Sequence, residues 1–196
     1  MFLPGAGGRR SFWLPVADLL VAQGERHLLA WPGFGDVPAD DGVRSLSDLF
    51  DWVVARLPAG ASHVVAQSMG GVVAARLAIE RPERVGSLVL AATSGGVDVA
   101  RLGAADWRDA YRRELPGLPP WFTDDRTDLT ARLGEITCPT LLLWSDSDPV
   151  SPLAVGTFLA ARIRTSRLAT IAGGSHAFAN ERAREVAAEI DAHLGG

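Results

Sequence analysis

A serine stands where an apolar strand-like run meets a helical run of small residues, in the stretch HVVAQSMGGVVAARLA. This serine, Ser68, has Ala66 two residues before it and Gly70 and Gly71 after it. A strand that turns sharply into a helix exposes the turn residue, and only small neighbours fit around such a turn. The pattern is typical of a nucleophilic serine, although Ala66 replaces the first glycine of the usual G-x-S-x-G motif. A plain helix N-cap is the alternative role for Ser68.

A nucleophilic serine needs a base, and the base needs an orienting carboxylate. Two candidate carboxylates, Asp146 and Asp148, follow the apolar run TLLLW, and His176 follows the run RLATI. Each of these loops comes after a strand that we expect to be parallel to the strand before Ser68. The three loops should therefore lie at one end of the sheet, and their order Ser, Asp, His fits nucleophilic catalysis on such a sheet.

Short apolar runs alternate with longer amphipathic segments along the whole chain. We expect strands at 2–3, 26–31, 62–67, 85–92, 140–144 and 167–171, and helices at 11–23, 45–57, 69–81, 151–161 and 180–194. Strands separated by helices indicate an α/β fold with a mostly parallel sheet of about six strands and helices on both faces. The length of 196 residues predicts a single domain, 1–196.

The stretch between Ala92 and Pro139 interrupts this alternation with Arg, Asp, Pro and aromatic residues. Long insertions in an α/β chain are often lids or binding loops, so we expect a short lid insertion at about 95–130. Four of its aromatic residues either line a substrate pocket or hold the lid on the core: Trp107, Tyr111, Trp121 and Phe122.

The composition excludes several classes of function. A net charge of −4 offers no basic field for nucleic acid, and no apolar stretch is long enough to cross a membrane. All 19 basic residues are arginine, which excludes a Schiff-base lysine and a Walker-type phosphate lysine. The only cysteine, Cys138, is expected to be a buried small hydrophobe. The histidines lack metal-ligand spacing and no secretory signal is present, which predicts a cytoplasmic protein without a metal.

Six segments resemble the α/β-hydrolase superfamily, in its small bacterial esterase-like branch, and together they span almost the whole chain: LPGAGGRRSFW, AWPGFG, AQSMGG, PERVGSLVL, CPTLLLWSDSDPVSP and GGSHAF. The resemblance implies Ser68 as nucleophile, Asp148 as acid and His176 as base. It favours Asp148 over Asp146 because the family acid directly precedes a run like Pro-Val-x-Pro.

The resemblance also implies an oxyanion hole formed by the backbone N–H groups of Ala6 and Met69. The chain departs from the family pattern at two positions near this site. Pro4 stands where the family usually has a histidine, and Ala30 stands where its P-G-x-G turn usually begins with aspartate.

The function implied by the resemblance is that of a serine hydrolase that cleaves a carboxylic ester or thioester through an acyl-enzyme intermediate, without a cofactor. Its substrate would be a small acyl compound, free or linked to a carrier. Two alternatives stay open because a fold does not determine a function. One is a C–C hydrolase or lyase that uses the same three side chains, and the other is a non-hydrolytic ligand-binding protein.

Overall fold

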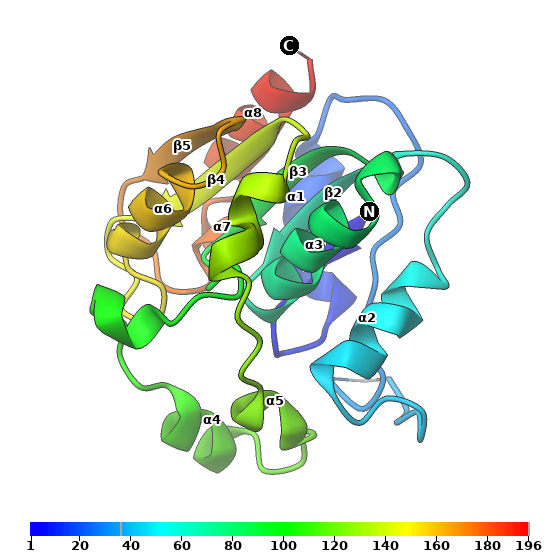
Figure 1. Ribbon diagram of the computed structural model, residues 1–196, viewed down its shortest axis with the longest axis vertical. Coiled ribbons are helices and arrows are strands. Elements are labelled where there is room, and N and C mark those ends of the chain that lie inside the picture. The colour runs from blue at the N-terminus through cyan, green and yellow to red at the C-terminus, as the bar shows by residue number, and fades with distance from the viewer. Residues whose placement is uncertain (36, 196) are drawn as a thin grey trace.

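The computed structural model describes residues 1–35 and 37–195, and a parallel sheet of five strands forms its centre (Figure 1). The strands lie in the order in which they occur along the chain: β1 (Phe2–Leu3), β2 (Ser62–Gln67), β3 (Val85–Ala91), β4 (Thr140–Ser145) and β5 (Ser166–Ile171). All neighbouring pairs are parallel. Parallel strands end at the same edge, so the loops after them can meet there.

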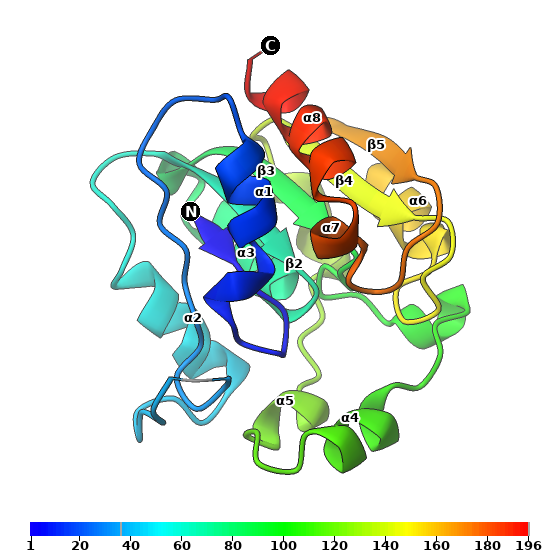
Figure 2. The ribbon, with the colours of Figure 1, turned by 180° about the vertical axis from the view of Figure 1, so that it is seen from behind.

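Helices cover both faces of this sheet. Figure 1 shows α2 (Leu46–Val54), α3 (Met69–Glu80) and α6 (Leu153–Ala160) in front of the sheet. Figure 2 shows α1 (Leu14–Leu19), α7 (Phe178–Glu181) and α8 (Ala183–Leu194) on the opposite face. Successive residues of β4 alternate between the two apolar cores, with Leu142 and Trp144 on the α3 side and Leu141 and Leu143 on the α8 side. Burial of both faces explains why the central strands are apolar throughout.

The segment 26–31, expected to be a sixth strand, forms only one β-bridge, between Leu28 and Phe2. Its partner strand β1 has only two residues, which is too short for a longer run of strand pairing. Trp31 then leaves the sheet, and its Nε1 donates to the carbonyl oxygens of Pro4 at 3.1 Å and Gly5 at 3.0 Å. The end of this segment therefore supports the turn after β1 and does not extend the sheet.

All five expected helices are shorter or divided in the structure, and two of them differ most. The helix expected at 11–23 is a 3-10 turn at Arg10–Phe12 followed by α1, which has a proline in its first turn. The helix expected at 180–194 is divided at Arg182 into α7 and α8. Every described helix is too short or too polar to span a membrane.

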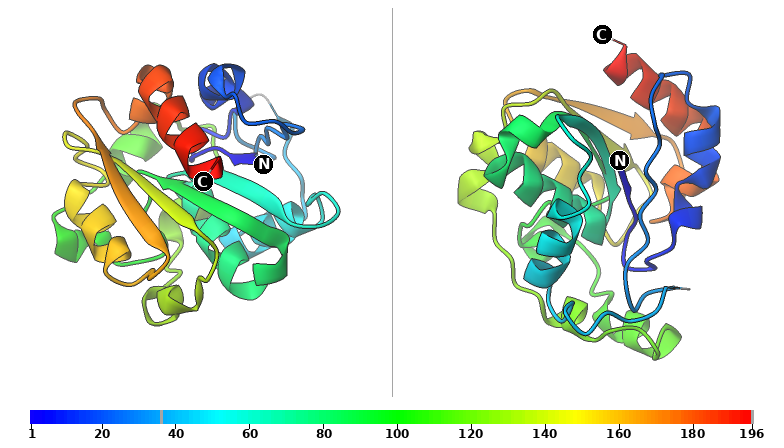
Figure 3. Two further views of the ribbon diagram at one scale, coloured as in Figure 1. Left: turned by 90° about the horizontal axis from the view of Figure 1, so that it is seen from above. Right: turned by 90° about the vertical axis from the view of Figure 1, so that its right-hand side faces the viewer.

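Between β3 and β4 the chain leaves the sheet and returns. It forms a 3-10 turn at Val99–Leu102, α4 (Arg108–Glu114), α5 (Trp121–Asp124) and a 3-10 segment at Thr130–Glu135. Figure 1 and the right-hand view of Figure 3 show α4 and α5 standing apart from the two helical layers, beyond the carboxyl ends of the strands. We call residues 104–128 the cap segment. It falls within the stretch where the sequence predicts a lid insertion.

Candidate active site

Ser68 connects β2 to α3 through a strained turn. Its backbone has φ 51° and ψ −119°, a conformation that residues with a side chain rarely adopt and that is frequent at functional sites. A Cβ atom on Gly70 would lie 2.5 Å from the carbonyl oxygen of Pro4, and one on Gly71 would lie 2.5 Å from the Thr93 side chain. Both contacts are too short, which explains the two glycines. Ala66, in contrast, is fully buried without disturbing the turn.

Side chains from three loops meet at the carboxyl ends of β2, β4 and β5. His176 Nε2 lies 3.0 Å from Ser68 Oγ, and His176 Nδ1 lies 2.7 Å from Asp148 Oδ2. The Asp148 side chain is fully buried, whereas that of His176 is 27% exposed. The other carboxylate oxygen, Asp148 Oδ1, accepts from the backbone N–H groups of Val150 at 2.8 Å and Ser151 at 3.2 Å. The main chain thus holds one oxygen of Asp148, and the other faces the imidazole.

Asp146, the alternative carboxylate, has different partners. Its Oδ1 accepts from the Ser147 hydroxyl at 2.7 Å and from the Gly173 N–H at 2.8 Å. These hydrogen bonds, that of Ser147 first, hold the pKa of Asp146 below its usual range. The structure therefore brings Asp148, and not Asp146, into contact with the imidazole of His176. Asp146 instead holds the first part of the loop that carries His176.

Several further side chains support the His176 loop, and sequence reasoning missed them. Ser145 Oγ lies 2.9 Å from the carbonyl oxygens of Gly173 and Gly174. The Glu181 carboxylate accepts from the N–H and the hydroxyl of Ser175, and these hydrogen bonds lower the pKa of Glu181. Gln67, directly before Ser68, donates from Nε2 to the His176 carbonyl oxygen at 3.1 Å. No local pattern predicts the contacts of Ser145 and Gln67, because their partners lie 28 or more positions away along the chain.

The two residues expected to stabilise an oxyanion both line the cavity that contains Ser68. Ala6 lies in the turn after β1, and Met69 is the first residue of α3, where backbone N–H groups have no partner within the helix. Among the described residues, neither N–H donates to a protein acceptor. The Tyr111 hydroxyl of the cap segment donates to the Ala6 carbonyl oxygen at 3.2 Å, and burial raises the pKa of Tyr111 to about 12.

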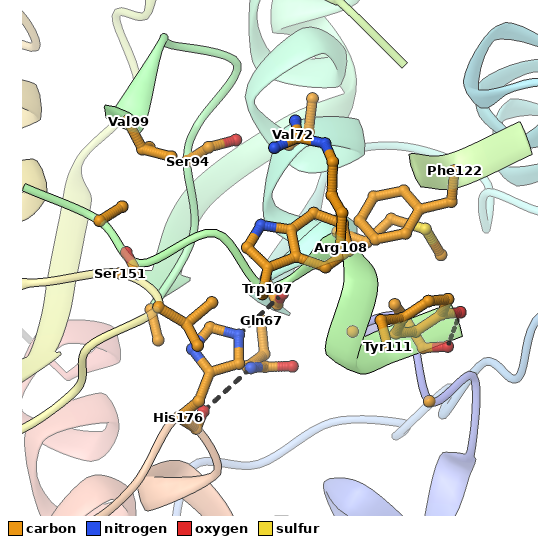
Figure 4. A pocket seen from close by; sticks show the side chains of 18 of the residues that line it. Gln67, Val72, Ser94, Val99, Trp107, Arg108, Tyr111, Phe122, Ser151 and His176 are labelled. Atoms are coloured by element: carbon orange, nitrogen blue, oxygen red, sulfur yellow. Dashed lines mark hydrogen bonds between the residues drawn. The ribbon is translucent and has the colours of Figure 1, made fainter. Parts of the chain in front are cut away.

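A cavity of about 1340 Å³ lies between the cap segment and the loops that follow the strands. Trp107 and Phe122 line it together with Tyr111 (Figure 4). The rings of Trp107 and Phe122 are stacked, with centroids 5.1 Å apart and an interplanar angle of 24°. Trp121 does not line this cavity and instead packs edge-on against the buried Phe34, with centroids 5.5 Å apart. Consecutive residues of a helix point about 100° apart, which is consistent with Phe122 facing the cavity while Trp121 points to the core.

Within residues 1–35 and 37–195, no group of three or more His, Cys, Asp or Glu side chains lies close enough to hold a metal ion. The partly buried Cys138 lies outside the lining of the cavity, and burial raises the pKa of its thiol.

Comparisons with known proteins agree with this architecture. RutD of Azorhizobium caulinodans, named as a carbamate hydrolase, is 27% identical over 218 aligned residues, which cover 89% of this chain and 82% of RutD. A pimeloyl-acyl-carrier-protein methyl ester esterase of Aeromonas salmonicida is 37% identical over 95 residues, which cover 48% of this chain and 37% of the esterase. The crystal structure of a hydrolase from Pseudomonas aeruginosa PA01 matches with a TM-score of 0.77 and 25% identity, covering 100% of this chain and 89% of the other. A family model described as alpha/beta hydrolase fold matches residues 1–133, and the chain therefore belongs to the α/β-hydrolase family.

Proposed function

We propose that the protein is a serine hydrolase that cleaves a carboxylic ester or thioester. The observation that carries this proposal is the pair of hydrogen bonds that joins Ser68 Oγ to His176 Nε2 and His176 Nδ1 to Asp148 Oδ2, at 3.0 and 2.7 Å. Both distances are those of a nucleophile, a general base and its orienting carboxylate. The strained backbone of Ser68 supports the same role, because packing alone does not require it.

In the proposed reaction, Ser68 Oγ attacks the carbonyl carbon of the substrate while His176 Nε2 takes the hydroxyl proton. Asp148 keeps the proton of the neutral imidazole on Nδ1 and stabilises the imidazolium that forms. His176 then donates the proton to the leaving oxygen or sulfur, and the acyl group stays on Ser68. A water molecule, activated by the same imidazole, releases the acid and restores the serine.

The negative charge on the tetrahedral intermediate also needs donors. We assign this role to the backbone N–H groups of Ala6 and Met69, which line the cavity and have no protein acceptor in the described part of the chain. The positive end of the α3 dipole lies at Met69 and adds to the stabilisation. One oxyanion-hole donor typically contributes about 10²–10³ to kcat.

The cavity favours a substrate with an apolar group. Trp107, Phe122 and Tyr111 present aromatic faces, and Val72, Val97 and Val150 add aliphatic surface. A volume of about 1340 Å³ is larger than that of most pockets for compact small molecules, so an acyl group with a long attached arm would fit. The methyl ester esterase similar to this chain is named for a carrier-linked substrate. An acyl group carried on an extended arm is therefore part of the proposal.

A turnover panel tests the proposed function. Purified protein is assayed with p-nitrophenyl esters and acyl thioesters of graded chain length, beside the Ser68→Ala variant. We expect hydrolysis with a preference among chain lengths, and a loss of roughly four to six orders of magnitude in kcat for Ser68→Ala. Absence of turnover across the panel would favour the C–C hydrolase or the binding protein instead. Retention of more than about a tenth of the activity by Ser68→Ala would remove Ser68 from the mechanism.

A further inference from the structure

Gln67 is a buried polar residue that the proposed mechanism does not use. It is the last residue of β2 and directly precedes Ser68, and 4% of its surface is exposed. A carboxamide in such a place is costly unless its polar atoms are bonded. Its partners therefore indicate why the chain keeps an amide here.

The carboxamide of Gln67 lies between two loops. On one side, Nε2 donates to the carbonyl oxygen of His176 at 3.1 Å, as the dashed line in Figure 4 shows. On the other side, Oε1 lies so close to Gly5 that a Cβ atom there would be 2.2 Å away. Gly5 belongs to the turn after β1 that also carries Ala6. Gln67 thus packs between the turn of the proposed oxyanion donor and the loop of the proposed base.

The His176 loop spans the distance from the end of β5 to Ser68 at the end of β2. It follows β5, and the sheet order places β4 and β3 between β5 and β2. Three strand spacings of roughly 4.8 Å amount to about 14 Å between the end of β5 and Ser68. The bonds of Asp146 and Ser145 hold the first part of the loop, at Gly173 and Gly174. Glu181 binds Ser175, but among the described residues no hydrogen bond joins it to the main chain of His176.

His176 itself is held at two points besides Ser68. Asp148 holds the ring at Nδ1, and Gln67 holds the main chain at the carbonyl oxygen. A single hydrogen bond at Nδ1 leaves the imidazole free to pivot about that atom. Fixing the main chain of the same residue removes this freedom, because the side-chain rotamer then determines where Nε2 points.

We propose that Gln67 is a positioning residue that holds the backbone of His176 so that Nε2 stays within hydrogen-bond reach of Ser68 Oγ. This inference rests on the proposed function of Ser68 and His176. Gln67 acts through His176 and takes no proton. A misplacement of about 1 Å in a reacting group lowers rates by about 10²-fold, which sets the upper limit of the effect.

Gln67→Leu tests the proposal because it nearly keeps the volume and removes the donor. We expect kcat for a p-nitrophenyl ester to fall by about 10- to 100-fold, with KM changed by less than about twofold. The rate of Ser68 labelling by a fluorophosphonate should fall by the same factor, since that reaction also needs the base. Gln67→Asn, whose amide is too short to reach the carbonyl, should lower both rates as well. If Gln67→Leu does not fold, the rates of Gln67→Asn test the positioning role in its place.

Thr165→Val is the matched control. Thr165 Oγ1 donates to the carbonyl oxygen of Cys138 at 2.7 Å, so this too is a hydrogen bond from a side chain to the main chain. Thr165 directly precedes β5 and therefore lies at the opposite end of the strands from Ser68. We expect this variant to keep the kcat, the KM and the labelling rate of the wild type. A folded Gln67 variant with kcat and labelling rate within about twofold of the wild type would overturn the role of Gln67 alone. A wild type that is neither labelled nor active would overturn the proposed function as well.

Discussion

Replacing Asp148 by asparagine exchanges one carboxylate oxygen for an NH₂ group, and the structure shows the hydrogen-bond partners of both oxygens. Asp148 Oδ1 accepts from the N–H groups of Val150 and Ser151, at 2.8 and 3.2 Å. An asparagine at this position must keep its carbonyl oxygen there. Turning the amide would place its NH₂ group against two N–H donors, of which that of Ser151 is buried, and a buried unsatisfied group costs about 1–3 kcal/mol. The NH₂ group of the asparagine therefore faces His176 Nδ1, which lies 2.7 Å from Oδ2 in the wild type.

This arrangement forces the wrong tautomer of the imidazole. Nδ1 must now accept a hydrogen bond, so the ring proton moves to Nε2, which then donates to Ser68 Oγ and cannot take its proton. We expect kcat to fall by about 10⁴ for Asp148→Asn, with little change in KM or in thermal stability. Steady-state hydrolysis of the best ester of the panel measures this loss, and circular dichroism checks the fold.

Asp146→Asn is the control for this prediction. An asparagine there can still accept from the Gly173 N–H through Oδ1, so we expect a loss of less than about tenfold. Reversed magnitudes would transfer the orienting role to Asp146. Small effects of similar size in both variants would refute the tautomer argument and place the orienting group elsewhere.

Other variants test the cap segment and the cysteine. Phe122→Ala should change the ranking of ester chain lengths in the panel, with little loss of stability in denaturation. Trp121→Ala should cost about 3 kcal/mol of unfolding free energy and leave the ranking unchanged. An unchanged ranking in Phe122→Ala together with a changed ranking in Trp121→Ala would remove Phe122 from the pocket. Tyr111→Phe removes the donor to the Ala6 carbonyl and should weaken binding of a boronic acid, which mimics the tetrahedral intermediate, by roughly three- to tenfold; equal affinities would show that this bond does not hold the turn. Because burial raises the pKa of the Cys138 thiol, iodoacetamide at pH 8 should alkylate the folded protein much more slowly than the unfolded chain, and equal rates would contradict this assignment.

The region around Ser68 was predictable because its sequence permits few conformations. The expected strand at 62–67 is β2 to the residue, and the helix expected at 69–81 is α3 with one residue fewer. The turn at Ser68 is determined by the apolar residues before and after it and by two glycines, Gly70 and Gly71, that no larger residue can replace. The meeting of Ser68 and His176 with a carboxylate of the loop after β4 also follows from the sequence, because all three loops come after parallel strands. The order of the strands does not distinguish Asp148 from Asp146, and only the family resemblance favours Asp148.

Other features depend on partners that the local sequence does not reveal. The apolar run at 26–31 has strand character, but β1 beside it has only two residues, so no ladder can form. The pair Trp121 and Phe122 gives no sign of which ring faces the cavity. The contact between Gln67 and His176 joins positions 109 residues apart and exists only once the loops are folded over the sheet edge.

The central claim is that Ser68 is a nucleophile activated by His176, and covalent labelling tests it most directly. Purified protein is incubated with a fluorophosphonate, and its intact mass is measured, followed by peptide mapping. We expect one adduct per chain, located on Ser68, absent in Ser68→Ala and formed much more slowly in His176→Ala. An unlabelled wild type, or an adduct that persists in Ser68→Ala, would contradict the proposed mechanism.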